Sequence, residues 1–235
     1  MRGIMGANFS SLFFDSPPVP ECLLHAGKER VFQPSEMLIE SGTAPVGCYY
    51  IIEGLVFAVD FQENGERVFG LIVDRDTLLG ETSLLLDAPF TMGFQAQIKT
   101  RGLFITKADF FDLFTSSAEV SQYVARIAAK KMFSIKGLYS NWHNESVLWR
   151  VCNVILELTR RYGQDFEGGK LIAFPLSHQL LADFAHANRV TVTKCMQLLK
   201  NTGLVRRINN TYNIPNVQRL ETYTKTEATS YHNSI

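Results

Sequence analysis

The chain has 235 residues, 46% of them hydrophobic, with 23 basic and 23 acidic side chains. This hydrophobic content is enough to form the cores of one large or two modest domains. No apolar run approaches the length of a membrane-spanning helix, and the first twenty residues lack the charged start and apolar stretch of a signal peptide. We therefore expect a cytoplasmic protein with no membrane partner.

Charge is distributed unevenly along the chain. Residues 1–145 carry 12 basic and 17 acidic side chains, a net charge of −5, whereas residues 146–235 carry 11 and 6, a net charge of +5. An acidic part joined to a basic part is typical of a sensor that carries a nucleic-acid-binding module. The charge pattern therefore favours nucleic-acid binding by the C-terminal part.

The first hundred residues have the pattern of β structure. Extended runs alternate with turn signals such as Ser41-Gly42 and Glu53-Gly54. Asn64-Gly65 is a strong hairpin signal, because this pair accepts the positive φ angles of a tight turn. Many short strands at regular spacing predict a small barrel or jelly roll. Strands are expected at Met37–Glu40, Cys48–Glu53, Leu55–Phe61, Arg67–Val73, Gly93–Ile98 and Gly102–Thr106.

A long helix without proline is expected from about Ser117 to Asn144. One set of its residues recurs at about 3.5-residue spacing, which predicts the seam of a two-stranded coiled coil. Lys131 and Ser134 interrupt this seam with polar groups. Either a polar pair sets the register or Lys131 extends to water, or both side chains face a sensor pocket at the dimer axis. The seam consists of Val120, Val124, Ile127, Lys131, Ser134 and Leu138.

Two short helices joined by a break are expected within Leu176–Val205. Ser177 and Asn188 stand where the helices begin, and both residue types are favoured N-caps. The second helix has a short, basic, hydrogen-bonding outer face, which suits insertion into a DNA major groove. A helical hairpin with a solvated polar face is the alternative interpretation. The outer face comprises Arg189, Val190, Thr191, Thr193, Lys194 and Gln197.

A strand hairpin follows the second helix. Leu204–Ile208 and Tyr212–Ile214 read as two short strands around an Asn-rich turn. A helix-turn-helix followed by a hairpin is a winged helix, and Arg206 and Arg207 lie where DNA phosphates can be met. The wing makes DNA binding the favoured interpretation.

These motifs together resemble the CRP/FNR family of bacterial transcription regulators. Residues Asn188–Lys194 (NRVTVTK) stand where the family has S-R-x-T-V-x-R, and Gly203-Leu204-Val205 stands where it has G-L-I. The order E-S-G, Y-Y-I-I-E-G, E-N-G-E and L-L-G-E is similar to the family's cyclic-nucleotide-binding roll. The resemblance covers roughly Pro34 to Ile214.

The resemblance implies an α+β fold in three parts. Residues 1–115 form an effector-sensing β-roll (a cyclic-nucleotide-binding-like jelly roll), residues 116–145 a central dimerisation helix, and residues 146–235 a C-terminal winged helix-turn-helix. It also implies a homodimer that binds double-stranded promoter DNA and RNA polymerase under the control of a small-molecule effector. The expected DNA contacts are Ser177, Gln179, Asn188, Arg189, Val190, Thr191, Thr193, Lys194, Arg206 and Arg207.

Side-chain chemistry predicts features of the operator. Arg189 can contact guanine or a phosphate, and Lys194 a phosphate or a base edge. Val190 stands where most relatives have glutamate; it can pack on a thymine methyl but cannot accept from cytosine. We predict an A·T-rich palindrome whose half-sites lie about one helical turn apart, ~34–36 Å. His186 replaces the usual turn glycine and tolerates a left-handed backbone better than most residues.

The roll departs from relatives that bind cyclic nucleotide. Those members hold the ribose with a Gly-Glu pair, matched here by Gly80-Glu81, and the phosphate with an arginine that is missing near Thr91-Met92. A cyclic phosphate needs a guanidinium or equivalent donors, so we do not expect cyclic AMP as effector, nor a resident cofactor. Gly80 then has a second interpretation, a turn between strands. The expected effector-site residues are Gly80, Glu81, Thr91, Lys131 and Ser134.

One branch, the halorespiration regulators of the CprK type, is most similar. It shares the Val-Thr-Val run, a lysine on the central helix and a short tail, here residues 228–232. That branch senses chlorinated phenolates, which implies that Lys131 pairs with a phenolate. Tyr49, Tyr50 or Phe94 would then line an apolar slot.

Redox, haem-bound gas and enzymatic functions are the alternatives. Cluster-binding relatives use closely spaced cysteines, a spacing that Cys22, Cys48, Cys152 and Cys195 do not have. The last three read as buried, and Cys22, in an expected loop, is the candidate for redox activity. A haem stays open, because a single ligand leaves no pattern. A cupin-like enzyme needs clustered histidines on strands, and the roll has none; we expect no catalytic or metal-binding residues and no enzyme.

Overall fold

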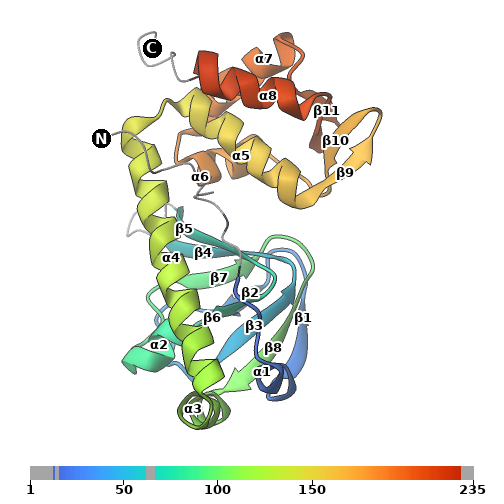
Figure 1. Ribbon diagram of the computed structural model, residues 1–235. Helices are drawn as coiled ribbons and strands as arrows, with labels where there is room; N and C mark the ends of the chain where they lie inside the picture. Colours follow the sequence, from blue (N-terminus) through green and yellow to red (C-terminus); the bar gives the residue numbers. More distant parts are fainter. Residues whose placement is uncertain (1–12, 14–15, 62–66, 229–235) are drawn as a thin grey trace, which may run out of the picture. The chain divides into compact units, whose positions relative to one another are not determined.

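The computed structural model describes residues 13, 16–61 and 67–228. It divides into two compact units, residues 1–136 and 137–235. The division falls inside the long helix α4 (Ala118–Asn144), which runs through the middle of the chain in Figure 1. The expected Asn64-Gly65 turn and residues 229–232 of the tail lie outside the described residues.

The first unit is a roll of two four-stranded antiparallel sheets. Their strand orders are β1-β8-β3-β6 and β2-β7-β4-β5. The six predicted strands are confirmed, with ends displaced by no more than two residues, whereas the short strands β1 and β6 were not predicted. The strands are β1 (Lys28–Phe32), β2 (Met37–Ile39), β3 (Gly47–Glu53), β4 (Leu55–Phe61), β5 (Arg67–Asp74), β6 (Thr77–Leu79), β7 (Gly93–Ala96) and β8 (Thr100–Thr106).

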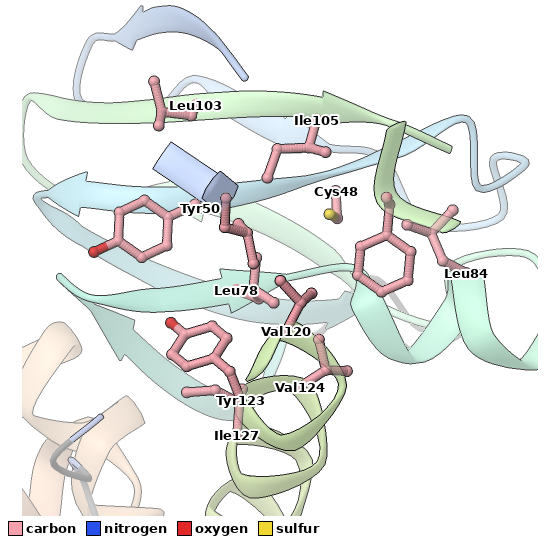
Figure 2. Packing of buried hydrophobic residues seen from close by; sticks show 12 residues of the cluster. Cys48, Tyr50, Leu78, Leu84, Leu103, Ile105, Val120, Tyr123, Val124 and Ile127 are labelled. Atoms are coloured by element: carbon pink, nitrogen blue, oxygen red, sulfur yellow. The ribbon is translucent and has the colours of Figure 1, made fainter. Parts of the chain in front are cut away.

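Strand β3 contributes to two separate cores because its side chains alternate between faces. Tyr49 and Ile51 lie in the core that also receives Val56, Leu79 and other residues of both sheets. Cys48 and Tyr50 lie on the opposite face, in a second core covered by helices (Figure 2). The covering helices are α1 (Glu21–His25), α2 (Glu81–Leu86), α3 (Lys107–Ser116) and the first turns of α4.

The long helix is confirmed, but its predicted seam is wrong in the first half. Val120, Val124 and Ile127 are at most 1% exposed and pack in the second core of this chain's own roll (Figure 2). A heptad-like repeat arises from packing on a sheet as well as from packing on a partner helix, so the pattern did not distinguish them. The exposed apolar side chains lie on another face of α4, where Met132 is 69% and Ile135 52% exposed. The side chain of Leu138 lies outside the described ones.

The second unit contains the predicted helix-turn-helix and wing. A four-stranded sheet of order β11-β12-β10-β9 accompanies its helices. Strands β11 and β12 confirm the predicted wing, whereas β9, β10 and α8 were not predicted. The elements are α5 (Val147–Tyr162), β9 (Gly163–Phe166), β10 (Gly169–Ile172), α6 (His178–Ala185), α7 (Arg189–Asn201), β11 (Arg206–Ile208), β12 (Thr211–Ile214), α8 (Val217–Tyr223) and a π-helical turn (Thr224–Ala228). None of the helices in the described residues is long and apolar enough to span a membrane.

Candidate functional site

Two predicted caps fix the starts of the helix pair. Ser177 Oγ accepts a hydrogen bond from the N–H of Leu180 at 3.0 Å, and Asn188 Oδ1 accepts one from the N–H of Thr191 at 2.8 Å. Each bond satisfies a backbone donor that the first helical turn would otherwise leave without a partner. The sequence signals for α6 and α7 are therefore confirmed.

The turn between α6 and α7 is built around His186. This residue adopts φ 45° and ψ 58°, the left-handed conformation expected for it, and its N–H caps the end of α6. Arg150 of α5 supports the turn: its Nη1 donates to the carbonyl of Ala185 at 2.7 Å and to that of His186 at 2.9 Å. Burial, followed by the charge of Arg150, lowers the pKa of His186 to about 4. A neutral histidine therefore sets the turn near pH 7.

Helix α7 separates its side chains cleanly. Val192 and Leu199 are fully buried and Met196 is 3% exposed, whereas Val190 on the other side is 67% exposed. The outer side chains are those predicted: Arg189, Val190, Thr193, Lys194 and Gln197 are exposed and Thr191 is half-buried. This face can place arginine, lysine, hydroxyl and amide groups against base edges and phosphates.

The wing presents two arginines. Arg206 and Arg207 are both exposed on β11. Arg207 is oriented by Tyr212 of β12: its Nη1 donates to the tyrosine oxygen at 3.3 Å, and its guanidinium lies 5.8 Å from the ring centroid. Asn209, with φ 49°, makes the tight turn between the strands. The wing is thus a short hairpin with a fixed cation on its surface.

Gln179 and His178 both lie at the start of α6. The amide of Gln179, a predicted contact, donates to Asp183 on its own helix at 2.8 Å. Sequence reasoning missed His178, whose Nδ1 lies 2.9 Å from Thr193 Oγ1 on α7 and whose ring stacks on Tyr212. Since Thr193 is fifteen residues away, no local pattern indicated this contact.

In the roll, Lys131 and Glu81 form a buried ion pair. Lys131 Nζ lies 2.7 and 2.8 Å from the two carboxylate oxygens of Glu81 and donates to the carbonyl of Leu78 at 2.6 Å. The Glu81 side chain is fully buried and that of Lys131 is 12% exposed. The interpretation that Lys131 extends to water is therefore wrong, because its ammonium is directed into the protein.

The other predicted effector residues are less closely joined. Gly80 has φ 87°, and a Cβ there would lie 2.9 Å from the Phe90 ring, so the turn itself requires glycine. Thr91 follows Phe90 and is exposed; its carbonyl accepts from Ser41 Oγ at 3.3 Å. Ser134 is 5% exposed on α4. The structure thus brings Glu81 and Lys131 into contact and gives Gly80 a structural role.

The three aromatic residues expected to line one slot do not share one. Tyr49 is buried in the core between the sheets, with Phe94 packed against that core. Tyr50 points to the opposite face, where its hydroxyl donates to Asp76 at 3.0 Å. Adjacent residues of a strand face opposite ways, so Tyr49 and Tyr50 cannot line a single slot.

The cysteines follow the expectation except for the location of Cys22. Cys48, Cys152 and Cys195 are buried, and burial raises the pKa of each thiol. Cys22 is exposed on helix α1, not in a loop. The described residues bring together no group of three or more His, Cys, Asp or Glu side chains able to hold a metal ion.

Comparisons with known proteins match both units. Residues 29–117 match the cyclic nucleotide-binding domain and residues 150–223 the Crp-like helix-turn-helix domain. The CRP-like cAMP-activated global transcriptional regulator of Mycobacterium tuberculosis is 22% identical over 172 residues, which cover 73% of this chain and 77% of that protein.

Solved structures share the fold. A CRP-family transcriptional regulator from Thermus thermophilus, TTHB099, superposes with a TM-score of 0.74 at 18% identity, over 85% of this chain and 98% of its own. The OCPA-complexed CprK structure gives 0.62 at 16% identity, over 84% and 89%. This likeness shows the shared architecture and does not single out the CprK branch.

A β-roll effector domain followed by a winged helix-turn-helix defines a DNA-binding transcription regulator. The chain belongs to the CRP/FNR family of these regulators. Its matches are to regulators rather than to enzymes.

Proposed function

We propose that this regulator binds a palindromic, A·T-rich promoter site as a homodimer, with helix α7 in the major groove. The observation that carries the proposal is the exposed outer face of α7, where Arg189, Val190 and Lys194 project while the opposite side is buried. Arg189 and Lys194 supply contacts to base edges and phosphates. Because its proposed ligand is promoter DNA, we also propose that the protein acts in the cytoplasm.

Val190 accounts for the proposed base preference. Its side chain is 67% exposed although it is apolar, and it stands in the first turn of α7. An apolar side chain at the major-groove edge gains by packing on a thymine methyl and has no acceptor for the cytosine amino group. We therefore propose an A·T pair opposite Val190 in each half-site.

The proposed homodimer uses α4, within residues 116–145. Met132, Ile135 and Tyr139 are exposed apolar residues at heptad spacing. The same spacing continues backwards to Ala128 and Ala125, two small side chains of which Ala125 is exposed. This stripe lies roughly 100° around the helix from the face that packs on the roll, because each residue turns about 100°. One helix can therefore contact its own roll and a partner helix together.

We propose that the effector, a small anionic and halogenated aromatic molecule, acts at the Lys131–Glu81 pair. An anion that binds Lys131 takes the place of the Glu81 carboxylate, which is otherwise held by both oxygens. Because a buried ion pair is costly to break without a replacement charge, such an exchange changes how α4 is held on the roll. DNA binding and contact with RNA polymerase follow as the proposed output.

Selection from a randomised duplex library tests the DNA-binding proposal. The expected result is an inverted repeat of A·T-rich half-sites about 10–10.5 base pairs apart, centre to centre. Enrichment of a single or direct half-site, or no enrichment, would contradict it. Transcription with purified RNA polymerase from a promoter that carries the selected site is expected to change when the regulator is added.

Thermal shift with halogenated phenols tests the effector proposal. A phenol that binds as its anion should raise the melting temperature of the wild-type chain, and Lys131→Met should abolish the shift. Equal shifts in both proteins would place the ligand elsewhere. Cyclic AMP serves as the comparison ligand, and a Lys131-dependent shift with cyclic AMP alone would overturn the proposed effector class.

A further inference from the structure

His178 connects the two helices of the winged domain to the wing. Its Nδ1 is 2.9 Å from Thr193 Oγ1 of α7, and its ring stacks on Tyr212 of β12 with 6.4 Å between centroids and 14° between planes. The other side of this arrangement carries Arg207, whose Nη1 is 3.3 Å from the Tyr212 oxygen. The imidazole is thus held in one orientation beside the arginines of the proposed DNA-binding surface.

The hydrogen bonds determine which ring nitrogen carries the proton. Thr193 Oγ1 donates its single hydrogen to the carbonyl of Arg189 at 2.8 Å. It can therefore only accept from His178 Nδ1, so Nδ1 is the protonated nitrogen. In the neutral imidazole Nε2 then has a lone pair and no hydrogen, and a second proton can add only there.

The surroundings keep this imidazole neutral in the absence of DNA. Partial burial, followed by the positive charges of Arg207 from the wing and Arg189 from α7, lowers the pKa of His178. Tyr212 beside it has a raised pKa and stays uncharged. A DNA phosphate contacted by these arginines reverses the sign of the local field, because it brings negative charge to the same place.

We propose that His178 is a proton-linked phosphate-binding residue, whose Nε2 takes up a proton from solvent when the protein binds DNA and donates it as a hydrogen bond to a backbone phosphate oxygen. The inference rests on the DNA binding proposed above. A phosphate is the fitting partner because a protonated imidazole forms its strongest hydrogen bonds with anionic oxygens. Contacts of this kind fix the orientation of a protein on the duplex rather than read its sequence.

Proton uptake makes DNA affinity depend on pH. Between the pKa of His178 in the protein alone and its higher pKa in the complex, affinity increases as pH falls, by up to about tenfold per pH unit for one proton. Above the higher pKa the dependence disappears. His186, with its pKa of about 4, titrates below this range.

The test is the affinity of the full-length protein for its own selected duplex, measured by fluorescence anisotropy at constant ionic strength between about pH 5.5 and 8. His178→Asn keeps a donor at the position of Nδ1 but has no Nε2 to protonate. We expect the wild-type slope to vanish in His178→Asn. The control His25→Asn, at an exposed site in the roll, should keep the wild-type slope.

A second pair of variants tests the tether. Thr193→Ser retains the hydroxyl and should retain the slope, whereas Thr193→Val removes the acceptor and should reduce it even if affinity falls at every pH. Histidine NMR of the complex should show the pKa of His178 above its value in the protein alone. An unchanged slope in His178→Asn, or an unchanged pKa on binding, would overturn the proposal. Failure to select any duplex would instead overturn the proposed function itself.

Discussion

Lys131 on α4 binds both carboxylate oxygens of Glu81 on α2, at 2.7 and 2.8 Å, across fifty residues of sequence. Glu81 belongs to the Gly-Glu pair that resembles the ribose-binding pair of cyclic-nucleotide-binding relatives. In this chain the carboxylate is already occupied by a side chain of the central helix. The same bond therefore fills a ligand-binding position and fastens α4 to the roll.

Loss of one partner of this pair should be costly. Lys131→Met leaves the Glu81 carboxylate buried with its opposite charge removed, so we expect the free energy of unfolding to fall by about 3–5 kcal/mol. The double variant Lys131→Met/Glu81→Leu removes both charges and should recover most of that loss. Urea unfolding of the three proteins measures the difference.

An exposed ion pair gives the matched control. Lys107→Met breaks the contact with Asp87, whose side chain is 79% exposed, and should cost less than about 1 kcal/mol. A Lys131→Met variant that is no less stable than Lys107→Met would show that the Lys131–Glu81 pair does not hold α4 to the roll.

Dimerisation should depend on the exposed stripe of α4. Ile135→Glu places a charge at the proposed helix–helix contact and should convert the dimer to monomer in analytical ultracentrifugation. Gln122→Glu adds the same charge on an exposed side of α4 away from the stripe and should leave the dimer intact. Equal sedimentation of both variants would remove the stripe from the dimer interface.

The base preference should depend on Val190. Val190→Glu introduces an acceptor for the cytosine amino group, so the selected half-site should change from thymine to cytosine at one position. The discrimination between these bases should move by roughly 1–3 kcal/mol. Val190→Thr keeps a methyl group and should keep the wild-type preference. The same selected sequence from wild type and Val190→Glu would show that this side chain does not read the base.

Stability should decline on acidification because of His186. Its pKa in the folded protein is about 4, below the unperturbed value of about 6.5, so the unfolded chain takes up the proton first as pH falls. The stability contribution is therefore complete above about pH 6.5 and is lost as pH falls towards 4, by at most on the order of 3 kcal/mol. His186→Asn tolerates the left-handed backbone and should flatten this dependence in urea unfolding at each pH. A parallel decline in both proteins would assign the acid sensitivity to other groups.

Local signals predicted the helix-turn-helix and wing well. The caps Ser177 and Asn188 act on backbone groups three residues away, so sequence alone contains both members of each contact. The outer face of α7 follows from helical periodicity in the same way. The wing needed only a short turn at Asn209, which tolerates its φ of 49°.

Contacts between distant segments were not predictable. The repeat of Val120, Val124 and Ile127 has the same spacing whether it packs on the roll or on a partner helix, and only the tertiary structure distinguishes the two. Strand β6 has three residues, too few for a periodic signal. The Lys131–Glu81 pair joins a helix to a residue fifty positions earlier, and no motif indicates such a bond.

The affinity of the selected duplex for a variant of the α7 face tests the central claim most directly. Arg189→Ala/Lys194→Ala removes two exposed cations from that face, and Lys28→Ala/Lys99→Ala removes two exposed cations from the roll. The account predicts that the first variant loses roughly a hundredfold or more in affinity and sequence preference. The second should stay within about threefold of wild type, because it makes the same change in net charge away from the proposed contact. Equal affinities of the two variants would contradict the assignment of α7 as the DNA-binding surface.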